Sequence, residues 1–86
     1  MDINQLINII KKKISDSINV ESIIVEDKTF LHKKHDSFRK DKFHIRIKIE
    51  SEELRYKKKI EATKIVHSIL NEEIKNYIHS IQIFFE

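Results

Sequence analysis

The eight residues Phe43 to Glu50, FHIRIKIE, decide which fold this chain can adopt. Apolar and polar side chains alternate along the whole stretch, so Phe43 and the isoleucines fall on one side and the polar groups on the other. A period of two places these two sets on opposite faces of a β-strand. The stretch therefore predicts a strand with one buried face and one solvent-exposed face. The side chains expected at the surface are His44, Arg46, Lys48 and Glu50.

A second strand is predicted upstream, at Val20 to Asp27 (VESIIVED). This segment is short, rich in β-branched residues and bounded by charged groups, as strands often are. Because only a polar, lysine-rich segment separates it from residues 43–50, we expect the two strands to pair as an antiparallel hairpin with a long basic loop.

An amphipathic helix is predicted before the first strand, because apolar residues recur at helical spacing up to about Ser15 or Ser17. Asp2 and Gln5 have the spacing of a capping box, in which each side chain satisfies a backbone donor at the start of the helix. With no glycine available, Asn19 is expected to end the helix in the left-handed conformation.

The second half of the chain predicts two more helical segments and a final strand. Ser51 is a suitable cap for a helix that begins with two glutamates, and a second helical stripe runs from Lys57 to about Asn76. Residues Ile78 to Phe85 are β-branched and aromatic, which predicts a strand. The order αββααβ indicates a single two-layer α+β domain over residues 1–86, with a three-stranded sheet and helices on one face.

The absence of glycine and cysteine excludes several kinds of function. Without glycine, the chain cannot form a phosphate-binding loop, a dinucleotide fingerprint or a nucleophile elbow, and we expect no enzyme. Without cysteine, it can form no disulfide and must bind any metal through His, Asp, Glu or an external ligand, which fits a reducing cytoplasm. Its apolar runs are too short for a membrane span, and its acidic start does not look like a signal peptide.

Positive charge is concentrated in one part of the chain. Residues 28–48 hold eight basic side chains against two acidic ones, a local charge of +6, so the remainder carries −3 within the net charge of +3. A basic patch of this kind favours an anionic partner, such as nucleic acid, an acidic protein surface or glutathione. The alternative is an ordinary solvated surface.

Within this basic segment, residues 27–35 (DKTFLHKKH) place His32 and His35 three positions apart. Two histidines form a weak metal-binding signal, because zinc normally has four ligands and no third or fourth lies nearby in the sequence. The alternative is a solvated loop. His79, at the start of the last predicted strand, is by itself an ordinary edge histidine.

Four segments, taken in order, resemble the BolA family. DKTFLHKKH is similar to its loop, in which an acidic residue and a hydroxyl residue precede a histidine or cysteine. KFHIRIKIES resembles the second strand, IVHSILNEEI the long helix, and IHSIQI the start of the last strand. The resemblance covers nearly all of residues 3–84.

This resemblance implies a class II KH-like fold and a non-enzymatic role as partner of a monothiol glutaredoxin. In such pairs a [2Fe–2S] cluster is held between the proteins, with glutaredoxin and glutathione thiolates on one side and histidines of the BolA-like chain on the other. The matching ligands are His79 and His32, with His35 as the second choice in the loop. We expect no cluster in the isolated protein, which is then a monomer or a weak homodimer. Residues expected to dock the partner or an anion are Lys33, Lys34, Arg39, Lys40 and Lys64.

The role implied is iron–sulfur cluster trafficking or assembly, or regulation linked to iron, redox state or stress. The alternative is a KH-like transcriptional regulator that binds DNA. A KH domain grips the nucleic-acid backbone with a GXXG loop, which this chain cannot form. The sequence also departs from the family at its basic Arg-His-Arg run, where it has Ala62, Thr63 and Lys64.

Overall fold

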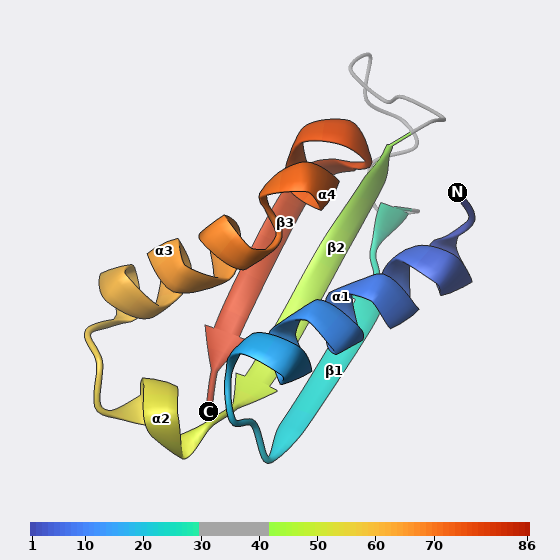
Figure 1. The fold of residues 1–86 in the computed structure, drawn as a ribbon. Coiled ribbons are helices and arrows are strands. Elements are labelled where there is room, and N and C mark those ends of the chain that lie inside the picture. Colours follow the sequence, from blue (N-terminus) through green and yellow to red (C-terminus); the bar gives the residue numbers. More distant parts are fainter. Residues whose placement is uncertain (30–41) are drawn as a thin grey trace.

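A computed structural model describes residues 1–29 and 42–86 of the chain. Figure 1 shows a three-stranded sheet with α1, α3 and α4 packed on one face, which confirms the predicted two-layer α+β architecture. The elements are α1 (Ile3–Ser17), β1 (Ser22–Asp27), β2 (Phe43–Glu50), α2 (Glu52–Arg55), α3 (Lys59–Ile69), α4 (Asn71–Asn76) and β3 (Ile78–Phe85).

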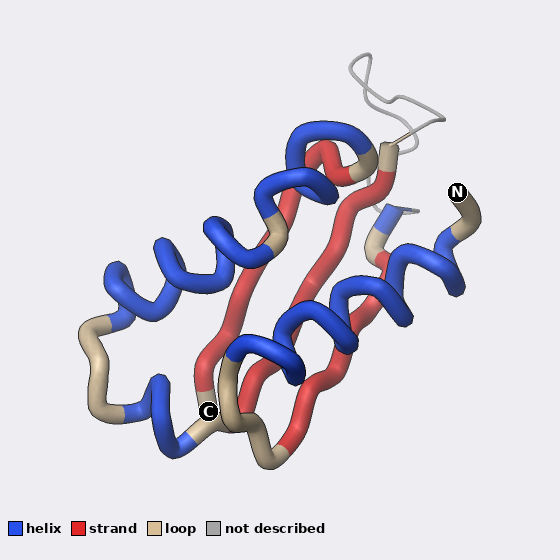
Figure 2. Tube along the Cα trace, viewed as in Figure 1, coloured by secondary structure: helices blue, strands red, loops and turns tan. Residues whose placement is uncertain are grey.

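The strand with the clearest alternation, β2, lies at the centre of the sheet (Figure 2). It pairs antiparallel with β1, as predicted, and parallel with β3. Its Ile47 lies opposite Val25 of β1 and Ile83 of β3, and it is fully buried under the helices. The other buried apolar side chains are Leu6, Ile10, Ile14, Ile18, Ile45, Ile49, Leu54, Ala62, Val66, Leu70 and Ile78.

The two ends of α1 test two predictions. The capping box is confirmed, because the Gln5 N–H donates to Asp2 Oδ1 over 2.8 Å and the Asp2 N–H donates to Gln5 Oε1 over 3.0 Å. The predicted left-handed conformation at Asn19 is wrong, since no residue in 1–29 or 42–86 has a positive φ. The helix ends instead at Ile18, which is extended and donates its N–H to the Ile14 carbonyl.

The helix predicted from Lys57 to Asn76 is divided in two. It begins at Lys59 and is interrupted at Leu70, where φ and ψ of −98° and 18° depart from helical values. The Leu70 N–H donates to the Val66 carbonyl, which is the ordinary α-helical bond, and also to the Ser68 carbonyl two residues earlier. The apolar pattern continues through the bend, which explains why the sequence gives no sign of it. No helix in the described ranges is both long and apolar enough to cross a membrane.

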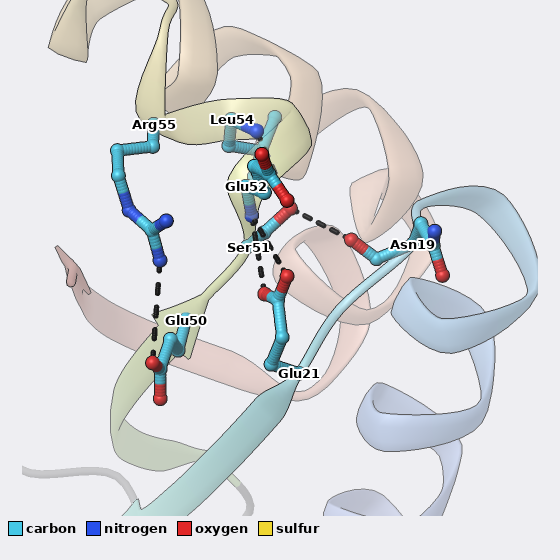
Figure 3. Close-up of polar contacts among 7 residues, drawn as sticks. All are labelled: Asn19, Glu21, Glu50, Ser51, Glu52, Leu54 and Arg55. Atoms are coloured by element: carbon cyan, nitrogen blue, oxygen red, sulfur yellow. Dashed lines mark hydrogen bonds and ion pairs between the residues drawn. The ribbon is translucent and has the colours of Figure 1, made fainter.

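Ser51 joins the connection after α1 to the connection after β2 (Figure 3). Its hydroxyl donates to the Asn19 carbonyl over 2.8 Å and accepts from the Leu54 N–H, so it caps α2 as predicted. Glu21 adds a second tie, because its carboxylate accepts from the Glu52 N–H over 3.1 Å. These bonds satisfy donors at a helix end, and Ser51 itself is 2% exposed.

Lys13 of α1 forms ion pairs with Glu73 and Glu72 of α4 at the edge of the core. Lys13 Nζ donates to Glu73 Oε2 over 2.7 Å, and Glu73 is 5% exposed. The hydrogen bond to Glu73 raises the pKa of the Lys13 ammonium above its ordinary value of 10.5, and the negative charges of Glu73 and Glu72 act in the same direction. Because the pKa is higher in the folded chain, this contribution to stability is complete below pH 10.5 and is lost as pH rises through the folded value.

We therefore expect Lys13→Met to lower the free energy of unfolding at neutral pH, because it leaves a buried carboxylate without its cation. Adding Glu73→Leu should recover most of the loss, since an apolar pair replaces the buried charges. Urea unfolding measures both effects. The control is Lys12→Met, whose ion pair with Asp16 is exposed and should contribute little. Equal losses in the Lys12 and Lys13 variants, or a Lys13 effect that grows above pH 10.5, would contradict this account.

Candidate functional site

A β-bulge at the start of β3 places His79 at the surface. Ile78 pairs with Phe43 and Ser80 pairs with His44, so His79 is an extra residue in β3. Beyond the bulge, Ile81 pairs with Ile45 on the face that the helices cover. In a bulge, two residues of one strand lie opposite one residue of its partner. His79 and Ser80 thus lie opposite His44, and the His79 imidazole is exposed.

The structure corrects the prediction that His44 is a surface residue. His44 lies on the predicted face of β2, which no described helix covers, but it is only 4% exposed. Its ring packs against the His79 ring, with 4.9 Å between centroids and 56° between planes. Its Nδ1 is 2.7 Å from Ser80 Oγ, and the histidine tautomer decides which atom donates. Strand alternation places this side chain on the outer face, where it is nevertheless buried and contacts His79 and Ser80 of β3.

Residues 28 and 29 form the stem that leads into residues 30–41, and both are hydrogen-bonded to the backbone of His44. The His44 N–H donates to Thr29 Oγ1 over 3.2 Å, and the His44 carbonyl accepts from the Lys28 N–H over 2.7 Å. Asp27 in turn accepts from the N–H and the hydroxyl of Thr29. The acidic residue and the hydroxyl residue singled out in the sequence thus have a structural role. They fix the chain beside β2, three positions before His32.

The other stem is bonded to the connection between α4 and β3. Lys42 Nζ donates to the Lys75 carbonyl over 3.3 Å, and the Phe43 N–H donates to the Tyr77 carbonyl over 2.9 Å. Both stems therefore lie at the end of the sheet that carries the bulge. Of the candidate ligands, the described residues include His79 alone. His32, His35, Lys33, Lys34, Arg39 and Lys40 lie outside the described residues.

Lys64, the remaining predicted docking residue, is exposed on α3. It borders an open groove of about 400 Å³ between α3 and the end of α1, away from the bulge on β3. The structure does not bring Lys64 and His79 together. Lys64 is therefore separate from the histidine cluster, which we define as His44, His79 and Ser80.

A second basic feature lies at the turn between α2 and α3, which the sequence analysis did not single out. Arg55 and three successive lysines, residues 57–59, surround Tyr56, whose side chain is 82% exposed. A cleft of about 240 Å³ next to this turn is lined in part by Arg55, Lys57 and Lys59, and Phe84 is among its apolar lining residues. The sequence did contain a signal for this basic feature, because residues 55–59 combine four cations and one tyrosine.

The described residues do not form a complete metal site. Within 1–29 and 42–86, no group of three or more histidine, aspartate or glutamate side chains is placed to hold a metal ion. At the bulge of β3, the exposed imidazole of His79 lies against the buried ring of His44.

Comparisons with known proteins agree with this architecture. The profile of the family described as BolA-like protein matches residues 14–85. The BolA domain of SufE1 from Arabidopsis thaliana has a TM-score of 0.77 at 20% identity, over 100% of this chain and 93% of that chain. BolA1 from Arabidopsis thaliana has a TM-score of 0.74 at 18% identity, over 88% of this chain and 83% of that chain.

A third solved structure, a bol-like protein from Babesia bovis, has a TM-score of 0.70 at 14% identity, over 91% of this chain and 79% of that chain. No curated protein matches the chain. At these identities the solved structures establish a common fold alone. The order αββααβ predicted from the sequence fits this fold when α3 and α4 are counted as the single helix expected there.

Proposed function

The chain belongs to the BolA-like protein family, and on this premise we propose that it is a non-enzymatic adaptor for a monothiol glutaredoxin. In the proposed complex the two proteins share a [2Fe–2S] cluster, with thiolates of glutaredoxin and glutathione on one side and histidines of this chain on the other. His79 and His32 are the proposed ligands, and His35 is the alternative to His32. The complex would serve cluster trafficking or assembly, or iron- and redox-linked regulation.

The observation that carries this proposal is the exposed imidazole of His79 on a bulge, beside both stems of the segment that contains His32. An imidazole nitrogen can ligate one iron of a [2Fe–2S] centre, where it raises the reduction potential relative to thiolate ligation. The absence of cysteine from all 86 residues is consistent with external thiolates and with a reducing compartment. We therefore propose a cytoplasmic location.

The test is to mix the protein with a cluster-loaded monothiol glutaredoxin and glutathione, and to record visible absorption and circular dichroism. We expect a heterocomplex whose cluster spectrum differs from that of glutaredoxin alone. An unchanged spectrum, together with salt-sensitive binding of DNA, would favour the second candidate function.

That second candidate is nucleic-acid binding, and one observation favours it. The turn between α2 and α3 presents four cations around an exposed tyrosine, which could contact phosphates and stack on a base. The lack of glycine weighs against it, because the backbone at this turn cannot approach nucleic acid as a GXXG loop does. A second point against it is that Arg55 already pairs with an acid, since its Nη2 lies 4.0 Å from Glu50 Oε1.

Two matched charge reversals separate the candidates. Lys33→Glu with Lys34→Glu should weaken the glutaredoxin complex about tenfold at low ionic strength, and less in 0.5 M salt, because these lysines are proposed to meet an anionic partner. Lys57→Glu with Lys59→Glu changes the net charge equally and serves as the control. Titration of each variant with glutaredoxin and with a single-stranded oligonucleotide gives the affinities. Unaltered glutaredoxin affinity in the first variant refutes the docking role of those lysines.

A further inference from the structure

The histidine cluster contains a residue to which the proposed function gives no role. His44 is buried, although it lies on the face of the sheet that no described helix covers. Its contacts include a bond from its N–H to Thr29 Oγ1, one to its carbonyl from the Lys28 N–H, and one between its Nδ1 and Ser80 Oγ. Backbone and ring are therefore both fixed, which is unusual for a polar residue of an open sheet face.

His79, by contrast, is exposed and is the extra residue of a bulge. An exposed side chain exchanges between rotamers within nanoseconds unless a neighbour restricts it. The ring of His44, 4.9 Å away and tilted by 56°, is such a neighbour. Aromatic pairs favour tilted arrangements at this separation, so the contact selects an orientation for the His79 ring.

We propose that His44 is a positioning residue for His79: the Ser80 hydroxyl fixes the His44 ring, and that ring holds the His79 imidazole in one orientation toward the partner. Restricting the imidazole before binding removes part of the ordering cost of complex formation. The affinity gain rests on the proposed function, because the partner toward which His79 is oriented is the cluster-carrying glutaredoxin. The orientation itself is a property of the isolated chain.

The first measurement uses the isolated protein without any cluster. Three-bond NMR couplings of His79 report the populations of its χ1 rotamers. We expect one dominant rotamer in the parent, a mixture in Ser80→Ala, and recovery in Ser80→Thr, which keeps the hydroxyl and suits a strand. The control is Gln82→Ala, which removes the bond from Arg46 Nε to Gln82 Oε1 on the same face and should leave His79 unchanged.

The second measurement titrates the same variants with the cluster-loaded glutaredoxin. Loss of a group that orients a metal ligand typically costs 10- to 100-fold in affinity, so we expect Ser80→Ala to weaken the complex about tenfold and Ser80→Thr to restore it. His44→Gln, which keeps a group able to bond to Ser80 but lacks the ring, should behave like Ser80→Ala. Ser80 is exposed, so its substitution should leave the fold intact, as far-UV circular dichroism would verify.

The outcomes distinguish this inference from the proposed function. If His79→Ala abolishes the altered cluster spectrum while Ser80→Ala keeps both the single rotamer and the affinity, positioning by His44 is wrong and the proposed function stands. If His79→Ala leaves the cluster spectrum unchanged, the proposed function fails. A rotamer mixture in the parent, equal to that in Ser80→Ala, would overturn the positioning role irrespective of the cluster.

Discussion

Replacing His79 by alanine should return the cluster spectrum of the mixture to that of glutaredoxin alone and weaken the heterocomplex about 100-fold, which corresponds to about 2.7 kcal/mol. The substitution removes the exposed imidazole but leaves the bulge and its backbone bonds in place. Docking contacts elsewhere would remain, so the expected result is a weaker complex whose cluster spectrum no longer differs from that of glutaredoxin alone. Visible circular dichroism reports the ligand change, and titration calorimetry gives the affinity.

The chain offers a matched control for this experiment. His67 is also an exposed histidine, but it lies on α3 and outside the histidine cluster. His67→Ala should therefore leave both spectrum and affinity as in the parent. Equal losses in the two variants would indicate an unspecific effect of removing a histidine, and parent behaviour in His79→Ala would exclude this residue as a ligand.

The fold could be predicted from the sequence because its elements have clear periodicity. The alternation in β2, the helical stripe of α1 and the capping box at Asp2 each follow from local rules, and each is confirmed. The end of α1 at Ser17 was predicted, but the extended backbone of Ile18 that follows it and the bend at Leu70 could not be predicted in the same way. Both depend on how the helices pack against the sheet, because the apolar pattern is the same with or without them.

The candidate site could be predicted only in part. His79 and the motif around Thr29 were found by resemblance, whereas alternation placed His44 on the correct face but with the wrong exposure. Alternation identifies the face on which a residue lies, but its exposure also depends on the side chains that other segments place against it. A signal for the bulge was present, since Ile78 and Ile81 are three positions apart whereas Ile81 and Ile83 are two apart. One residue must therefore be extra if all three face the core.

The second large effect expected is on stability. Ile47→Ala should lower the free energy of unfolding by about 3 to 4 kcal/mol, near the middle of the range for large-to-small substitutions at fully buried positions. Ile47 is 0% exposed and lies at the centre of the central strand, between Val25 and Ile83. Helices cover this face of the sheet, so a cavity here could be filled only by shifting several elements at once.

A loss of this size is a large fraction of the total free energy of unfolding, which is roughly 5 to 10 kcal/mol for domains of this length. The control is Ile24→Ala on β1, which removes the same atoms from a side chain that is 49% exposed, and it should cost less than about 1 kcal/mol. Ile47→Val should fall between them, at about 1 kcal/mol. Urea unfolding followed by far-UV circular dichroism gives all three values. Equal costs at positions 24 and 47 would mean that the sheet has no preferred buried face, and the alternation in FHIRIKIE could then not determine the fold.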